Sequence, residues 1–233
     1  MMNSEKQLVD FNTAKDNYRE VIERSIGFAG KGLDYYTKAK ADAFMRAVNA
    51  YFPHLQKPKL LDVGCGHGLI HPYLAGSFAI TGTDVAGEVL TLAAQQNPGV
   101  SYVPYDGAKL PFADATFDLA LAICVMHHVP PADWLKFLGD MKRVVKPQGG
   151  IFIFEHNPFN PLTRYVVSHN ELDHGVTLLS GGRLRKLMRE VGLRAPLTEN
   201  ILFTPFSQRF FTQLDKVLTW CPLGAQYFTF ART

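Results

Sequence analysis

Several features that define other classes of protein are scarce or missing in this chain of 233 residues. It has three cysteines, Cys65, Cys124 and Cys221, and their odd number and wide spacing fit neither a disulfide framework nor a zinc-binding pattern. The longest strictly apolar run, from Leu119 to Met126, is far shorter than the roughly 20 residues of a membrane-spanning helix. We therefore expect a cytoplasmic protein in a reducing compartment.

The sequence also lacks an apolar leader and a strong charge of either sign. Residues 1–11 are polar, which argues against a secretory signal. The net charge is only +3, and the densest basic stretch, from Arg183 to Arg189, reads most simply as the solvated face of a helix. Because a nucleic-acid-binding protein usually shows a basic stripe, we do not expect a nucleic-acid partner.

Apolar residues are abundant, at 47% of the chain, which excludes disorder over its whole length. Short apolar runs alternate with segments of helical periodicity, and this predicts an α/β fold, a parallel sheet with helices on both faces. The stretch 159–179 is expected to be irregular. The expected strands are 59–63, 79–84, 100–104, 117–124, 151–154, 197–203 and 227–231, and the expected helices are 17–26, 39–52, 88–96, 131–145, 183–191 and 207–220.

A glycine-rich turn follows the first expected strand, where Asp62 and Val63 lead into Gly64-Cys65-Gly66-His67-Gly68. Glycines let the backbone approach a ligand closely, because no Cβ stands in the way. The spacing is one residue shorter than the dinucleotide-binding pattern G-x-G-x-x-G. Asp62, just before the turn, would repel a pyrophosphate but suits a cationic ligand.

Asp84 closes the second expected strand, 16 residues after Gly68. A carboxylate at this place in an α/β fold accepts hydrogen bonds from the ribose hydroxyls of a bound nucleoside. The alternative is that Asp84 only caps the helix that follows.

Further segments complete a known pattern: Asp106-Gly107, the run from Leu110 to Asp118, and Met126-His127-His128-Val129. With the glycine turn and Asp84, they make the chain resemble class I S-adenosylmethionine-dependent methyltransferases. The resemblance implies a Rossmann-like, seven-stranded, mostly parallel sheet whose last strand, within 224–232, is antiparallel. It also implies S-adenosylmethionine as cofactor, held by Asp62, Gly64, Cys65, Gly66, Gly68, Asp84, Val85, Asp106, Gly107, Ile123 and His128.

Catalytic candidates lie at the ends of strands. Transfer from a sulfonium is a one-step displacement, and a base is needed only if the acceptor starts protonated. Glu155 and His156 follow the fifth strand, and Tyr36 could fold over the cofactor. His127 and His128 are interpreted mainly as structural or cofactor-packing residues, and no metal site is expected.

The resemblance also organises the chain as a single methyltransferase domain, with a helical N-terminal cap (1–56), a cofactor-binding core (57–156) and acceptor-side insertions with the final strands (157–233). The outer segments are rich in aromatic residues, which favours a small-molecule acceptor that is hydrophobic or lipid-linked. Contact of 204–224 with a membrane surface is a lesser alternative, suggested by Arg209 and Lys216 beside apolar residues. A cofactor-binding regulator without transfer activity and a nucleotide-linked oxidoreductase are rival functions, and the short glycine spacing counts against the second. The sequence leaves the choice between monomer and homodimer open.

Overall fold

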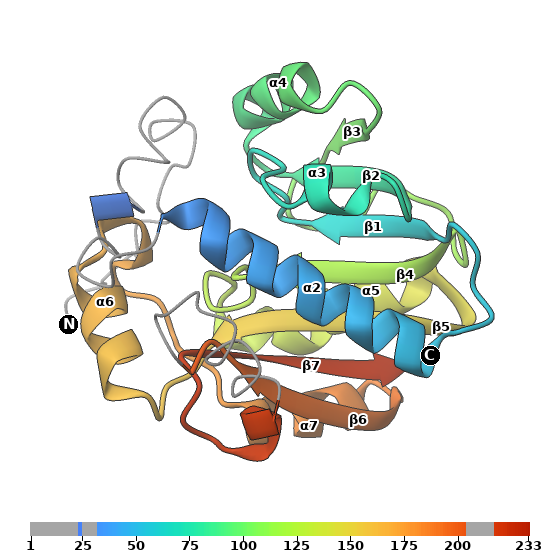
Figure 1. The fold of residues 1–233 in the computed structure, drawn as a ribbon. Coiled ribbons are helices and arrows are strands. Elements are labelled where there is room, and N and C mark those ends of the chain that lie inside the picture. The colour runs from blue at the N-terminus through green and yellow to red at the C-terminus, as the bar shows by residue number, and fades with distance from the viewer. Residues whose placement is uncertain (1–22, 25–31, 204–216) are drawn as a thin grey trace, which may run out of the picture.

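A computed structural model describes residues 23–24, 32–203 and 217–233 of the chain. Its centre is a seven-stranded sheet in the order β3-β2-β1-β4-β5-β7-β6 (Figure 1). β7 is antiparallel to β5 and β6, whereas the pairings among β1 to β5 are all parallel. The strands are β1 (Lys59–Val63), β2 (Ala79–Asp84), β3 (Ser101–Pro104), β4 (Phe117–Ile123), β5 (Val145–His156), β6 (Arg194–Ile201) and β7 (Gln226–Arg232). The predicted Rossmann-like sheet with an antiparallel last strand is thus confirmed.

Helices cover both faces of this sheet, as the alternating pattern predicted. α2 crosses the near face in Figure 1, and its buried residues share a core cluster with residues of α3. α5 and α7 contribute to the core on the opposite face. The helices are α2 (Leu33–Tyr51), α3 (His71–Leu74), α4 (Gly87–Gln96), α5 (Trp134–Val144), α6 (Pro161–His169) and α7 (Gly181–Glu190), with 3-10 turns η2 (Pro131–Asp133), η3 (Glu171–Asp173) and η4 (Leu218–Trp220).

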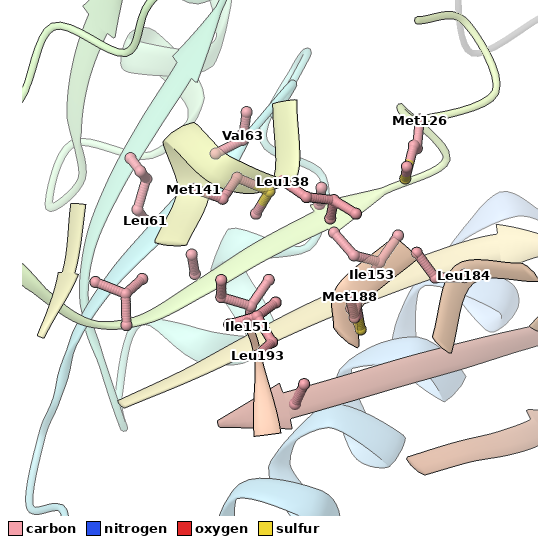
Figure 2. Packing of buried hydrophobic residues seen from close by; sticks show 14 of the residues in the cluster. Leu61, Val63, Met126, Leu138, Met141, Ile151, Ile153, Leu184, Met188 and Leu193 are labelled. Atoms are coloured by element: carbon pink, nitrogen blue, oxygen red, sulfur yellow. The ribbon is translucent and has the colours of Figure 1, made fainter. Parts of the chain in front are cut away.

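The two hydrophobic cores arise from alternation along the strands, because successive side chains point to opposite faces of a sheet. Leu61 and Ile153 pack with α5 and α7 on one side, as Figure 2 shows. Leu60 and Phe152 pack under α2 on the other, where the rings of Phe44 and Phe152 meet edge to face at 4.9 Å. The central strands are therefore apolar on both faces, and polar residues gather at their ends.

The stretch 159–179 was predicted to be irregular, and this prediction was wrong. It forms α6 and the turn η3. Asn160 caps α6 by accepting a hydrogen bond from the backbone N–H of Thr163 at 3.0 Å, and Pro161 occupies the first helical position. Both are recognised start signals, so the sequence did contain the helix.

Other elements also differ from the predictions. α3 was not predicted, and α2 and β5 each begin six residues earlier than expected, at Leu33 and Val145. β6 begins three residues earlier than expected, at Arg194, because its pairing with β7 extends past a bulge between Arg194 and Leu197. Of the expected helix 17–26 only Glu23 and Arg24 are described, and both are helical. The expected helix 207–220 lies mostly outside the described residues. No helix in the described ranges is long and apolar enough to cross a membrane.

Candidate active site

The glycine turn, residues 64–68, connects β1 to α3 at the carboxyl ends of the parallel strands. The N–H groups of Gly64 and Cys65 both donate to the carbonyl of Thr83, at 2.8 and 3.1 Å, which ties the turn to β2. Gly66 has a φ of +49°, and a Cβ built there would meet nothing within 4 Å. The backbone of Gly66 is therefore open to a ligand, and its conformation is one that side chains rarely adopt.

A buried polar chain supports this turn from below. The Asp62 carboxylate (Oδ2) lies 3.0 Å from Nε2 of His71, and Nδ1 of His71 lies 2.7 Å from the Tyr102 hydroxyl. A Cβ at Gly68 would come within 2.6 Å of both His71 and Tyr102, so that position has no room for a side chain. The structure thus shows why the third glycine is required, whatever ligand binds.

The other carboxylate oxygen of Asp62 is an orphan. Oδ1 is buried and has no hydrogen-bond partner among the residues that the structure describes. A buried acceptor without a partner costs free energy, and a donating or cationic ligand would satisfy it. Next to it, burial and the charges of Asp62 and Asp84 raise the pKa of the Cys65 thiol, which therefore stays protonated.

Asp84 is placed by two backbone hydrogen bonds. Its carboxylate accepts from the N–H of Gly66 and from the N–H of Ala86, each at 2.9 Å. The second bond resembles the capping role that was the alternative interpretation, and the first fixes the glycine turn. Burial, the largest influence, raises the pKa of Asp84. Each oxygen keeps a second lone pair, so ribose binding stays a prediction compatible with this geometry.

The ends of β2 and β3 bring another predicted group together. Gly107 has a φ of +78°, and a Cβ there would lie 3.4 Å from a methyl group of Val85. Asp106 is exposed, and hydrogen bonds from the N–H groups of Ala108 and Lys109 hold its pKa below the usual range. Val85, Asp106 and Gly107 therefore lie close together at the carboxyl ends of β2 and β3. Ile123, the last residue of β4, is half-buried.

Glu155, predicted as a catalytic residue, is fully buried at the end of β5. One oxygen accepts from the N–H groups of Met126 and His127, at 2.8 and 3.3 Å, and the other lies 2.5 Å from Nδ1 of His127. Both oxygens of the Glu155 carboxylate therefore bind the segment after β4 and hold it in place. This geometry favours a positioning role for Glu155 over direct contact with an acceptor.

His127, His128 and Asp173 form a cluster that the sequence reasoning did not find. Oδ1 of Asp173 lies 3.4 Å from Nε2 of His127 and 3.5 Å from Nε2 of His128. Burial opposes protonation of His127, but Glu155 and Asp173 outweigh it and raise its pKa well above the usual value. Burial and neighbouring His127 lower the pKa of His128 to about 4. His128 was predicted at the cofactor, and the structure places it in this cluster.

Asp173 was missed because it lies 45 residues beyond His128, in the stretch expected to be irregular. The sequence feature that could have indicated it is Asn170, whose side chain stabilises the turn that holds Asp173. The Asn170 side chain accepts from the N–H of Leu172 and donates to Oδ2 of Asp173 at 2.7 Å. Asparagine favours such local turns, but no spacing rule tells which distant strand the turn will face.

His156 and Tyr36 are less enclosed. His156 is half-buried, and its ring lies 5.2 Å from that of His127. Its Nδ1 lies 3.3 Å from the amide nitrogen of Gln226, which can only donate, so Nδ1 accepts. Burial, then the neighbouring Tyr35, raises the pKa of Tyr36, so this phenol is a hydrogen-bond donor at neutral pH.

α2 brings its N-terminal half to the carboxyl end of β4. Lys40, one turn after Tyr36, is close enough to Cys124 to help lower the pKa of that thiol, together with His156 and against the effect of burial. Because residues four apart share a helix face, Tyr36 lies on the side of α2 that faces this end of the sheet.

A groove of about 630 Å³ lies between α6 and the segment after it. Its lining mixes apolar residues (Pro161, Val167, Val176 and Leu178) with polar ones (Arg164, Ser168, His174 and Asp173 of the histidine cluster). The volume is in the range of small-molecule sites. Because Asp173 is part of the lining, the groove borders the histidine cluster.

Comparisons with known proteins agree with this arrangement. Residues 61–154 match a family model described as a methyltransferase domain. A solved S-adenosylmethionine-dependent methyltransferase from Thermotoga maritima matches with a TM-score of 0.70 and 18% identity, covering 95% of this chain and 97% of that one. The fold is that of class I methyltransferases.

Curated relatives are similar over part of the chain. A phthiotriol/phenolphthiotriol dimycocerosates methyltransferase of Mycobacterium ulcerans is 32% identical over 143 residues, 59% of this chain and 48% of the relative. A fatty-acid O-methyltransferase of Mycolicibacterium smegmatis is 35% identical over 101 residues, 41% of this chain and 36% of the relative. The chain thus spans about half the length, or less, of these relatives.

The chain contains a class I S-adenosylmethionine-dependent methyltransferase domain, as the sequence motifs predicted. S-adenosylmethionine is the cofactor of this domain. The residues fit it: the orphaned Oδ1 of Asp62 suits a cationic group, and Gly66 leaves its backbone open. The individual contacts of Asp62, Asp84 and Asp106 with the cofactor remain predictions.

Proposed function

We propose that this chain transfers a methyl group from S-adenosylmethionine to an oxygen atom of a small lipophilic acceptor. The groove beside α6 carries the proposal. Apolar residues such as Val176 and Leu178 line it together with the ionisable residues Arg164, Asp173 and His174. Asp173 lies 3.4 Å from Nε2 of His127, in the segment after β4. An acceptor bound there would place its polar end against the cluster and its apolar part along Tyr165 and Val176.

The lipophilic character has further support from the surface around the groove. Tyr165 and Leu162 of α6 are 57% and 53% exposed, and Trp220 is 76% exposed. Asn160, which caps α6, donates its side chain to the carbonyl of Leu223 at 2.7 Å, and Leu223 is itself 60% exposed. Exposed apolar side chains gathered in one region mark binding sites more often than scattered ones do. The two relatives named above are called a phthiotriol/phenolphthiotriol dimycocerosates methyltransferase and a fatty-acid O-methyltransferase.

S-adenosylmethionine supplies an activated methyl group, so the residues of this chain have mainly to bind and orient the acceptor. Such positioning is worth about 7–11 kcal/mol of a reaction barrier. We assign Asp62, Asp84 and Gly66 to holding the cofactor. Glu155 fixes the ring of His127, and Tyr36 donates a hydrogen bond to the acceptor side of the site. Residues 1–56 and 157–233 complete the acceptor side of a single domain.

The test compares acceptors that differ only in their apolar part. The purified chain is incubated with methyl-labelled S-adenosylmethionine and with long-chain or short-chain members of the same series of acids, alcohols or phenols. The proposal expects labelled product from the long-chain members and at least about tenfold lower kcat/KM for the short ones, since each buried CH₂ is worth about 0.8 kcal/mol. Equal rates for both members would contradict a lipophilic groove.

A substitution in the groove tests the same proposal by changing the protein instead of the acceptor. Val176→Asp replaces an apolar residue of the lining with a charged one and is expected to raise KM for long-chain acceptors without changing the affinity for S-adenosylhomocysteine. Cofactor binding with no turnover of any acceptor would favour the rival function, a binding protein without transfer activity.

A further inference from the structure

The histidine cluster, defined as His127, His128 and Asp173, brings three metal-ligating groups together. One ring nitrogen of each histidine and one carboxylate oxygen of Asp173 all lie within 4.8 Å of one another. Oδ1 of Asp173 is 3.4 Å from Nε2 of His127 and 3.5 Å from Nε2 of His128. Charge-assisted hydrogen bonds are about 2.7–2.9 Å long, so these atoms stand farther apart than directly bonded partners would.

The same separations suit a shared cation. Nitrogen and oxygen ligands lie about 2.0–2.2 Å from a tetrahedral zinc ion, which puts two such ligands about 3.3–3.6 Å apart. The two distances to Asp173 fall within this interval. Two imidazoles and one carboxylate form a ligand set that borderline divalent ions such as Zn²⁺ accept and that Mg²⁺, which prefers oxygen, does not.

A second, independent observation points to a ligand. The side chain of His127 is fully buried, and its Nε2 has no hydrogen-bond partner among the described residues. This atom is directed at Asp173, the carboxylate it shares with His128. The only charged group that faces this nitrogen in the described residues is Asp173, at a distance longer than a hydrogen bond, and a metal ion that takes the place of the Nε2 proton would bond to both.

The surroundings are also those of a metal centre. Nδ1 of His127 is bonded to Glu155, a carboxylate–histidine pair that orients a ring so that Nε2 faces outward. Asp173 is held by Asn170, which donates to Oδ2 at 2.7 Å and leaves Oδ1 toward the histidines. Both ligands are therefore fixed through their second polar atom.

We propose that His127, His128 and Asp173 bind a divalent cation of the zinc type, with further coordination left to solvent or to a ligand in the groove. Cation binding goes beyond the proposed function and holds whether or not a lipophilic acceptor is methylated. One consequence does rest on that function: because Asp173 lines the groove, the ion would lie where an acceptor oxygen is expected.

The test uses Co²⁺ as a visible probe on the purified full chain after chelation and dialysis. We expect one equivalent of Co²⁺ to bind with a tetrahedral absorption spectrum, Zn²⁺ to displace it, and excess Mg²⁺ not to. Asp173→Asn and His128→Gln should each weaken Co²⁺ binding at least about tenfold. His174→Gln is the matched control, because His174 is the exposed neighbour of Asp173 in the same turn.

Circular dichroism and thermal melting establish that each variant folds. His128→Gln decides the test if Asp173→Asn does not fold, since the side chain of His128 is 20% exposed. The proposal is overturned if the wild-type chain binds no stoichiometric Co²⁺ or Zn²⁺. It is equally overturned if folded Asp173→Asn and His128→Gln bind Co²⁺ as tightly as His174→Gln does.

Discussion

At the scale of single residues, the carboxylates near the site differ in how many of their oxygen atoms already accept hydrogen bonds within the protein. Glu155 has both oxygens occupied by the segment after β4, which makes it a positioning group. Asp62 keeps one buried oxygen without a partner, and Asp84 holds the glycine turn while retaining lone pairs. Sequence alone predicted where these residues lie along the strands. It could not show which oxygens are occupied, because their partners come from other strands and loops.

Replacing Asp84 tests its assignment to the cofactor. Asp84→Ala is expected to weaken S-adenosylhomocysteine binding at least tenfold, or about 1.4 kcal/mol, because it removes both the ribose acceptor and the bond to Gly66. Isothermal titration calorimetry measures the change. Asp42→Ala, an exposed position on α2, is the control and should bind normally. Unchanged affinity in Asp84→Ala would refute the assignment.

At the scale of elements, the sequence predicted all seven strands and most helices of the described region, because apolar runs and glycine turns mark them strongly. Two helices were missed: α3, which has only four residues, and α6, which begins at the second of two Asn-Pro steps that read as a stiff loop. α6 is the longer of the two. Tertiary contacts explain why it is stable: Thr163 donates to the carbonyl of Ala225, and Asn157 donates to those of Pro222 and Gly224. These partners are more than 60 residues away, so local pattern could not reveal them.

The cap of α6 can be tested directly. Asn160→Ala removes the bonds to Thr163 and Leu223 and is expected to lower the free energy of unfolding by about 0.5–2 kcal/mol. Urea denaturation gives this quantity. Asn49→Ala, at an exposed position on α2, should change it by less than about 0.5 kcal/mol. Equal effects of the two substitutions would show that the cap contributes nothing.

At the scale of the whole molecule, polar contacts join the central strands at their amino-terminal ends, opposite the site at their carboxyl ends. Asp118 accepts from the N–H of Lys59 at 2.8 Å and from the Lys146 ammonium at 2.7 Å, which joins the starts of β1, β4 and β5. Burial acts to raise the pKa of Asp118, but its bonds to Lys146 and Lys59 outweigh this and lower it. Structural and functional carboxylates thus occupy opposite ends of the same strands.

The lowered pKa gives a stability effect with a definite sign. The contribution of Asp118 is present above its usual pKa of about 3.8 and is lost as the pH falls through the lower folded value. Asp118→Asn should therefore cost about 1 kcal/mol near neutral pH and less at about pH 3. Urea denaturation at both pH values measures this. A cost that does not change with pH would contradict a charged role for Asp118.

The central claim is that this chain methylates a small lipophilic molecule with S-adenosylmethionine. The most direct measurement incubates the purified chain with methyl-labelled S-adenosylmethionine and a mixture of lipids, protein and RNA, and then counts the label in each separated fraction. The account predicts label in the organic-soluble fraction, matched by S-adenosylhomocysteine and strongly reduced in Asp84→Ala. Label in protein or RNA, or no acceptor-dependent S-adenosylhomocysteine at all, would contradict it.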